Sequence, residues 1–328
     1  MFYGMHVWTT NIKGKIREIF GKVSGMAGFS PNRRFPPPAP DTTPEQRFEQ
    51  VSGLPFDAVK PLLAYGLPDD TKIDIDFACS AGHDDKKTSF KIGLMAEQGD
   101  GLLLESLAVD FTIGILKPDI IKTYGTIRGQ GYGRRALANA ALFGQALGFK
   151  KIDLFASLEM GGYVWAKAGA EPAADQRYDL SRYIHAQLDR LQDVLPEAEY
   201  ARAHEWGRLR HAGDLQKLAA MSYDVSAYKD RLHEENTATR RASQTKDPED
   251  YTNEGFFKNG VTLGQFLLVG TIYSASIDFH ETRQMKTLAR YVDGPTNLAD
   301  LPPELRTQIR TPRRNRANNH SGLNKRQE

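Results

Sequence analysis

The sequence predicts an α/β fold in which helices flank a mixed β-sheet and a helical lobe is inserted. Apolar and polar residues alternate over residues 72–77, and apolar segments recur at 90–94 and 102–115, as expected of strands. A glycine-rich turn at residues 128–133 opens a run of good helix formers, and an apolar segment follows at 152–156. Meandering strands followed by a turn, a helix and another strand predict a mixed sheet.

Changes in composition divide the chain into five predicted parts. Proline gathers at residues 30–44, which is typical of an extended linker. Apolar residues at helical spacing fill residues 178–236 and predict the inserted lobe. The five parts are a mobile leader with its linker at 1–43, a core at 44–177, the helical insertion at 178–255, a strand and helix that complete the core at 256–294, and a disordered basic tail at 295–328.

Three further segments carry structural expectations. The core is expected to begin with a helix, because Thr43 and Gln46 fit a capping box around a proline at the first helical position. Residues 117–127 read as a loop that could fold over a bound ligand. Residues 261–273 are rich in apolar side chains and, together with the residues to Phe279, are expected to return to the sheet as a strand.

The composition is that of an ordinary globular protein. Of 328 residues, 40% are hydrophobic and 26% charged, and the net charge of +2 gives no bulk attraction to nucleic acid or membrane. The single cysteine, Cys79, excludes an intramolecular disulfide and a cysteine-based zinc site, and its apparent strand position predicts a buried structural thiol. No metal-binding spacing is present, so no metal is expected, and the sequence favours a reducing, cytoplasmic compartment.

The sequences of the two ends of the chain are compatible with more than one kind of binding partner. Ile12, Ile16 and Ile19 fall at helical spacing with basic residues opposite, so the leader could contact a membrane surface or a partner, or dock on the body. The basic tail could make weak contact with nucleic acid or an anionic surface, or serve only solubility. A mobile leader before a compact body also occurs in proteins delivered to another cell by a secretion system, and that route stays open.

The glycine-rich turn is the strongest candidate site. Closely spaced glycines let the backbone bend tightly, and a turn that feeds a helix N-terminus directs free N–H groups and the positive end of the helix dipole at one point. Arginines on both sides add positive charge. The sequence therefore predicts a phosphate or pyrophosphate site built from Arg128, Gly129, Gln130, Gly131, Tyr132, Gly133, Arg134 and Arg135.

Two common phosphate sites fit the turn poorly. Residues 131–136 match the loose dinucleotide pattern G-x-G-x-x-A, but residues 122–127 make a poor buried strand before it. A nucleotide-binding oxidoreductase is therefore a disfavoured alternative. A P-loop is excluded because no G-K-[ST] follows the glycines.

The turn resembles the acetyl-CoA pyrophosphate loop of the GNAT acetyltransferase superfamily, which reads R-x-x-G-x-G at the start of a helix. Arg128, Gly131 and Gly133 carry this match, and the resemblance extends over about residues 72–172. The sequence departs from the family at Ser157, where members often carry asparagine, and at Trp165, where they often carry tyrosine.

The resemblance implies acetyl transfer from acetyl-CoA to an amine within a GNAT-like central sheet. In the family a base takes the amine proton, an acid protonates the leaving thiolate, and N–H groups of the strand before the loop hold the thioester carbonyl. Glu105, with Asp110 as an alternative, is the candidate base, and Tyr163 is the candidate acid. The structural alternatives are a solvated strand face for the two carboxylates and a packed aromatic for Tyr163.

Two functions of different classes follow. The first is an acetyl-CoA-dependent N-acetyltransferase whose amine acceptor could lie on a protein, as in a bacterial effector or a phage-related protein. The alternative is a non-catalytic acyl-CoA-binding or protein-interaction module. The departures at Ser157 and Trp165 favour the alternative, whereas the intact glycine turn opposes it.

Overall fold

The computed structural model describes residue 39 and residues 41–78, 88–127, 129–156, 161–228 and 260–310. The chain forms two compact units, unit 1 with Met1–Ile152 and Val292–Glu328 and unit 2 with Asp153–Tyr291. Helices and a mixed sheet are both present, which confirms the predicted α/β class. The boundary between the units lies inside a strand, not at the predicted start of the helical lobe, and the five-part division stays a prediction.

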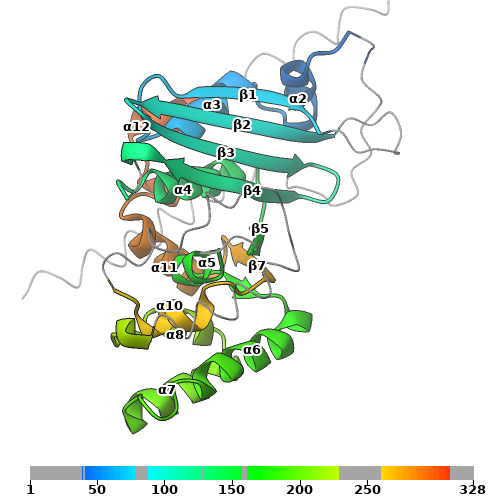
Figure 1. Ribbon diagram of the computed structural model, residues 1–328. Helices are drawn as coiled ribbons and strands as arrows, with labels where there is room; N and C mark the ends of the chain where they lie inside the picture. The colour runs from blue at the N-terminus through cyan, green and yellow to red at the C-terminus, as the bar shows by residue number, and fades with distance from the viewer. Residues whose placement is uncertain are drawn as a thin grey trace, which may run out of the picture. The chain divides into compact units, whose positions relative to one another are not determined.

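Unit 1 contains four antiparallel strands that pair in chain order (Figure 1). They are β1 (Lys72–Phe77), β2 (Ser89–Gln98), β3 (Gly101–Asp110) and β4 (Ile115–Tyr124). Leu116 of β4 pairs in parallel with Ile152, the second residue of β5 (Lys151–Ala156), which makes the sheet mixed. Alternate side chains of β2 and β3 are buried, as the period of a strand requires.

The expectation of a loop at residues 117–127 is wrong, because most of this segment is strand β4. β4 pairs with β3 from Ile115 to Tyr124, and the register shifts between Ser106 and Leu107. Leu107 lies opposite Pro118 and Ser106 lies opposite Ile120, so Asp119 is the extra residue of a β-bulge. The bulge lets a proline remain within the ladder, since bulged positions tolerate the missing N–H.

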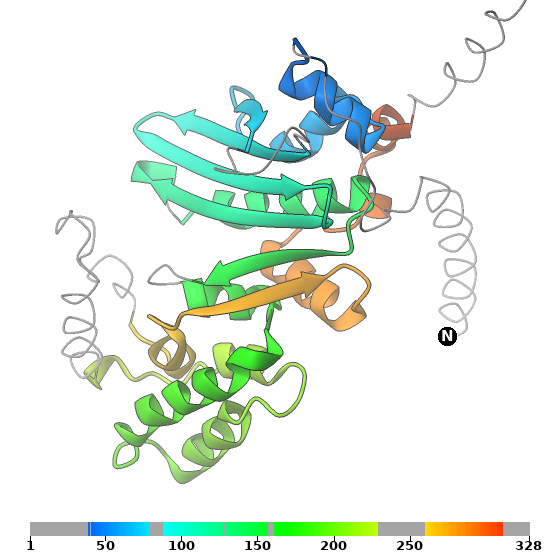
Figure 2. The same cartoon turned by 90° about the vertical axis from the view of Figure 1, so that its right-hand side faces the viewer.

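Helices cover one face of the unit 1 sheet (Figures 1 and 2). They are α2 (Pro44–Ser52), α3 (Phe56–Ala64) and α4 (Tyr132–Ala146). The predicted capping box of α2 is confirmed: Thr43 Oγ1 accepts from the Gln46 N–H, and the Gln46 side chain accepts from the Thr43 N–H at 3.0 Å. Phe48 of α2 packs edge-to-face on Phe90 at 5.6 Å and on Phe111 at 5.5 Å, which joins helix and sheet through aromatic contacts.

The expected disorder from residue 295 is wrong for the first part of the tail. A short 3-10 helix at Leu298–Asp300 and the helix α12 (Pro303–Arg310) belong to unit 1. Leu301 and Ile309 are buried, so two apolar side chains anchor a segment whose composition is otherwise polar. Residues 311–328, like residues 1–38, lie outside the described part of the chain.

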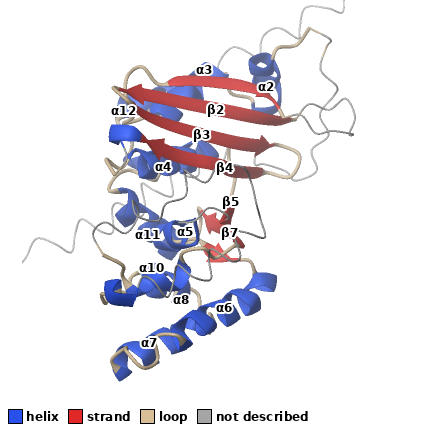
Figure 3. Cartoon of the chain, in the orientation of Figure 1, coloured by secondary structure: helices blue, strands red, loops and turns tan. Residues whose placement is uncertain are grey.

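Unit 2 combines the end of β5 with a helical lobe (Figure 3). Its strands lie in the order β5, β7 (Tyr273–Asp278) and β6 (Glu171–Pro172), and β6 pairs antiparallel with β7. The predicted helical lobe is described for residues 178–228 and is mainly helical there, although residues 220–225 form no helix. Its helices are α6 (Arg177–Asp189), α7 (Glu197–Gly207) and α8 (Asp214–Ala219), and the unit also holds α5 (Gly161–Ala168) and most of α11 (Thr282–Val292).

The expected return to the sheet by Phe279 is confirmed only in its last part, because strand β7 begins at Tyr273, whereas residues 263–268 form helix α10 (Leu263–Leu268). Thr262 and Gln265 form a second capping box, with Thr262 Oγ1 accepting from the Gln265 N–H. A short apolar run fits a buried helix as well as a strand, and here the local cap decides for the helix.

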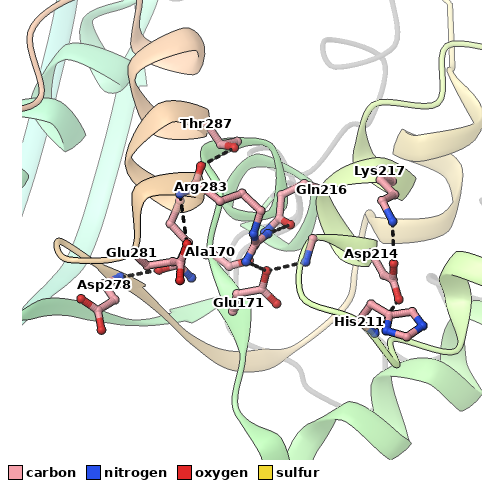
Figure 4. Close-up of polar contacts among 12 residues, drawn as sticks. Ala170, Glu171, His211, Asp214, Gln216, Lys217, Asp278, Glu281, Arg283 and Thr287 are labelled. Atoms are coloured by element: carbon pink, nitrogen blue, oxygen red, sulfur yellow. Dashed lines mark hydrogen bonds and ion pairs between the residues drawn. The ribbon is translucent and has the colours of Figure 1, made fainter. Parts of the chain in front are cut away.

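A polar network in unit 2 joins β6, α8 and α11 (Figure 4). Arg283 bonds Glu171 at 2.8 Å and donates to the Gln216 side-chain oxygen at 2.9 Å. The Gly213 N–H donates to Glu171 at 2.8 Å, and the Gln216 amide donates to the Ala170 carbonyl at 3.0 Å. These groups satisfy one another, so the network stabilises the unit and offers no free site to a ligand.

Gly162→Ala is expected to destabilise unit 2 by about 3 kcal/mol, the upper part of the usual range for an overpacked core. A Cβ at Gly162 would overlap Thr271 Oγ1 and lie 2.5 Å from the Leu268 carbonyl oxygen. The buried Tyr273 hydroxyl also donates to the Gly162 carbonyl at 2.7 Å, so a shift of this backbone would break a second contact. Urea unfolding followed by circular dichroism measures the loss.

Gly133→Ala is the control, because Gly133 also occupies an early position of a helix. A Cβ there would meet Ile121 Cγ2 at 3.6 Å, an ordinary contact. This variant should keep or slightly increase stability, since alanine has the higher helix propensity. Equal losses in both variants would contradict the packing argument.

Candidate functional site

The glycine turn has the backbone geometry of an anion site. Gly129 and Gly131 have φ angles of 86° and 89°, in the left-handed region that favours glycine. Gly131 is the N-cap of α4, and no side chain of the described residues caps the first turn. The first N–H groups of the helix are thus left without a side-chain acceptor, at the positive end of the dipole. Arg128 lies outside the described residues.

The β2–β3 hairpin supports this turn through contacts that the sequence did not indicate. Thr126 Oγ1 donates to Asp100 at 2.7 Å, and the Tyr132 hydroxyl donates to the Gln98 side-chain oxygen at 3.0 Å. Gly125 has a φ of 60°, and a Cβ there would overlap the Asp100 carbonyl. Gln98 and Asp100 therefore hold the segment on both sides of the glycines, and only the long-range pairing of the strands shows this.

The remaining predicted loop residues fall into two groups. Gln130 donates from its amide to the Thr126 carbonyl at 2.9 Å, and the exposed Arg134 folds back along the turn, with its Nη2 3.6 Å from where a Gly131 Cβ would stand. Arg135 instead donates to Asn139 at 3.1 Å and to the Pro295 carbonyl at 2.8 Å. Arg135 thus ties α4 to the C-terminal segment, and burial lowers the pKa of its guanidinium.

Glu105 lies in the middle of β3 on the sheet face that the helices cover. Its side chain is 4% exposed, and neither carboxyl oxygen has a hydrogen-bond partner in the described structure. Its cross-strand neighbours, Leu94 and Ile121, are apolar. Burial raises the pKa of Glu105 well above its usual range, so the solvated strand face weighed from the sequence is wrong for this residue.

The alternative base, Asp110, has a structural role. Its carboxylate accepts from Ser89 Oγ at 2.9 Å and from the Thr112 N–H at 2.7 Å, where it closes the turn between β3 and β4. An Asp that accepts local N–H donors in this way is typical of a turn. Asp110 therefore has less freedom than Glu105 to exchange a proton with a ligand.

Tyr163, the predicted acid, lies in unit 2 on α5. Its ring is half-buried, and the Lys167 ammonium lies 5.2 Å from its centroid, one helical turn later. Glu105 and the glycine turn share unit 1, whereas Tyr163 belongs to the other unit. Ser157, the other position that departs from the family pattern, lies outside the described residues.

Comparison of the chain with protein-family models, with curated proteins and with solved structures found no match. The resemblance to the GNAT superfamily therefore stays a prediction that rests on the residues quoted above. In the described part of the chain no cluster of three or more His, Cys, Asp or Glu side chains could hold a metal ion. The same residues include no helix that is long and apolar enough to cross a membrane.

Proposed function

We propose that the protein is an acetyl-CoA-dependent N-acetyltransferase that acts on an amine. The observation that carries the proposal is the turn before α4, in which two glycines with positive φ leave an uncapped helix N-terminus beside Arg134. Such an N-terminus suits a pyrophosphate, because N–H donors and the helix dipole act on the same point. The β-bulge at Asp119, in the strand before the turn, also supports the proposal. A bulge leaves backbone groups unpaired in the ladder, and such groups could hold the thioester carbonyl.

The two titratable candidates, Glu105 of unit 1 and Tyr163 of unit 2, have side chains whose chemistry suits acetyl transfer. The amine nitrogen forms a bond to the thioester carbon, the carbon–sulfur bond breaks, and the amine loses a proton while the thiolate gains one. Glu105 is the proposed base, acting through a water molecule, because its carboxyl has no hydrogen-bond partner among the described residues and burial raises its pKa, which favours proton uptake. Tyr163 is the proposed acid. The acceptor class we favour is an amine on a protein.

The proposal is tested by titrating acetyl-CoA into the full chain in a calorimeter. We expect saturable binding with a dissociation constant in the micromolar to millimolar range that is usual for enzyme substrates, roughly 1 μM–1 mM. Acetyl-pantetheine lacks the pyrophosphate and should bind more weakly. A folded protein that binds neither compound would overturn the proposal.

A second function, a non-catalytic acyl-CoA-binding or interaction module, is favoured by one observation. Glu105 is almost fully buried under the helices, which restricts direct access of an acceptor to its carboxyl. This function predicts acetyl-CoA binding without release of free thiol when a panel of amines and peptides is supplied. Thiol release above the rate of spontaneous hydrolysis would decide for the enzyme.

A further inference from the structure

The tip of the β2–β3 hairpin lies beside the glycine turn and has a well-defined backbone. Gln98 and Gly101 are the last pair of the two strands, so only Gly99 and Asp100 form the loop between them. Gly99 has a φ of 63°, the positive value that such a two-residue loop requires of its first residue. A loop this short leaves the chain little freedom, so Gln98 and Asp100 extend from defined positions.

Asp100 contacts the segment before the glycines in two ways. Its carboxylate accepts from Thr126 Oγ1 at 2.7 Å, and its backbone carbonyl lies so close to Gly125 that a Cβ there would overlap it. Gln130, in the middle of the turn, donates to the Thr126 carbonyl at 2.9 Å. Asp100, Thr126 and Gln130 therefore form a continuous series of contacts from the hairpin into the turn.

Gln98 contacts the other side of the glycines. Tyr132, the first residue of α4, donates from its hydroxyl to the Gln98 side-chain oxygen at 3.0 Å. The hairpin thus holds the residues on both sides of Gly129 and Gly131. Glycine loses more conformational freedom on ordering than other residues do, so anchoring both ends of the turn before a ligand arrives lowers the entropic cost of binding.

A buried carboxyl beneath the start of α4 is a second indication that this end of the helix receives a polar ligand. Glu105 is 4% exposed, and its carboxyl oxygens have no hydrogen-bond partner among the described residues. It lies opposite Ile121 in the sheet, and Ile121 Cγ2 is 3.6 Å from where a Cβ at Gly133 would stand, in the first turn of α4. Glu105 and the first turn of α4 therefore share the layer between sheet and helix, which is an observation independent of the hairpin contacts.

We propose that Gln98 and Asp100 are positioning residues, which hold the glycine turn in the conformation that receives the pyrophosphate of acetyl-CoA. They act through Tyr132 and Thr126, and the inference rests on the proposed binding of acetyl-CoA at this turn. Loss of the hairpin contacts should therefore weaken the binding of a ligand that carries the pyrophosphate more than that of a ligand that lacks it.

Charge and position predict opposite effects for Asp100. Its carboxylate is exposed and negative, so its removal should strengthen the binding of an anion if charge alone determined affinity. Positioning instead requires an oxygen that accepts from Thr126, whether or not that oxygen is charged. Asparagine supplies such an oxygen and alanine does not, so these two substitutions separate position from charge.

The test is calorimetric titration of acetyl-CoA and of acetyl-pantetheine into the full chain. Asp100→Asn should bind acetyl-CoA as tightly as the wild type or up to about fivefold more tightly, the effect of removing one exposed like charge. Asp100→Ala should bind it about tenfold more weakly, the effect of losing one hydrogen bond to a charged group. Both variants should bind acetyl-pantetheine as the wild type does, because this compound lacks the pyrophosphate.

The outcomes distinguish this inference from the proposed function. Wild-type binding of acetyl-CoA that becomes tighter in both Asp100 variants would overturn the inference alone, because charge would then explain the effect. An equal loss for acetyl-CoA and acetyl-pantetheine in Asp100→Ala would also overturn it, because the turn would not be the part affected. Failure of the folded wild type to bind acetyl-CoA would overturn the proposed function together with the inference.

A double-mutant cycle tests the contact on the other side of the glycines. Tyr132→Phe removes only the hydroxyl and should weaken acetyl-CoA binding about fivefold, the effect of losing one neutral hydrogen bond. In a Gln98→Leu background the same change should have no further effect, because the contact is already absent. Fully additive losses would contradict the role assigned to Gln98.

Ser89→Ala is the matched control. It removes a hydroxyl–carboxylate contact of the same kind, from Ser89 Oγ to Asp110 at 2.9 Å, at the opposite end of the same two strands. Its melting temperature should fall to a similar extent as that of Asp100→Ala, whereas its affinity for acetyl-CoA should stay that of the wild type. A loss of affinity equal to that of Asp100→Ala would show that general stability determines binding and would reject the inference.

Discussion

Replacing Gly131 and Gly133 together with glutamate is expected to weaken acetyl-CoA binding by about 100-fold or more, because like charges in contact cost several kcal/mol. Both positions lie at the start of α4, where the proposed site would receive the pyrophosphate. The glutamates would place negative charge on the point at which the helix dipole and Arg134 favour an anion. Isothermal titration of acetyl-CoA into the wild type and the variant measures the loss.

The control carries glutamine at the same two positions. It has nearly the same size as the glutamate variant and the same strain at Gly131, whose φ is positive, but it adds no charge. It should bind acetyl-CoA more strongly than the glutamate variant, and the difference should shrink at high salt, where exposed charges are screened. Equal binding by both variants would show that shape, not charge at the turn, determines affinity.

The parts of the fold with strong local signals were predictable from the sequence. Thr43 and Gln46 marked the start of α2, because a capping box depends on residues only three apart. The alternation at residues 72–77 marked β1, and the glycines before Tyr132 marked α4. Each of these signals lies within a short stretch of sequence, so the element could be predicted without knowledge of its tertiary contacts.

The predictions of secondary structure were wrong where tertiary contacts, not the local sequence, determine the structure of a segment. Residues 117–127 contain a proline and lack clear alternation, yet pairing with β3 across a bulge makes most of them a strand. The apolar run after Val261 fits a strand or a buried helix equally well by period. The tail after residue 295 reads as polar, but two buried apolar side chains, Leu301 and Ile309, hold it on unit 1.

The candidate site shows the same division. The glycine turn could be located from spacing alone, whereas the direction of each side chain could not. Arg134 and Arg135 are adjacent in sequence, yet their side chains point in different directions. Arg134 folds along the turn, whereas Arg135 bonds to Asn139 and to the carbonyl of Pro295, which lies 160 residues after it in the sequence. The contacts of Gln98 with Tyr132 depend likewise on a strand register that no local pattern fixes.

Glu105→Gln is expected to lower acetyl transfer by about 10²–10⁴-fold, the usual contribution of a general base. The same change should raise the stability of unit 1 at pH 8, relative to its effect at pH 4, by about 1.4 kcal/mol or more, the free energy of one pKa unit, because glutamine does not ionise. Burial holds the pKa of Glu105 in the fold above that of the unfolded chain. The wild type therefore loses stability as pH rises toward the folded pKa, and glutamine, which does not ionise, avoids this loss.

The two readouts separate a catalytic role from a purely structural one. Urea unfolding at pH 4 and pH 8 should show the gain only at pH 8, because at pH 4 much of the carboxyl is protonated in both folded and unfolded chains. Glu97→Gln on the exposed end of β2 is the matched control and should change neither activity nor stability. A gain at pH 8 with full activity would show that Glu105 is a buried acid without a catalytic role. Loss of activity together with the gain would mean that the fold gives up stability to keep an unpaired carboxyl at the site, as catalytic groups often require.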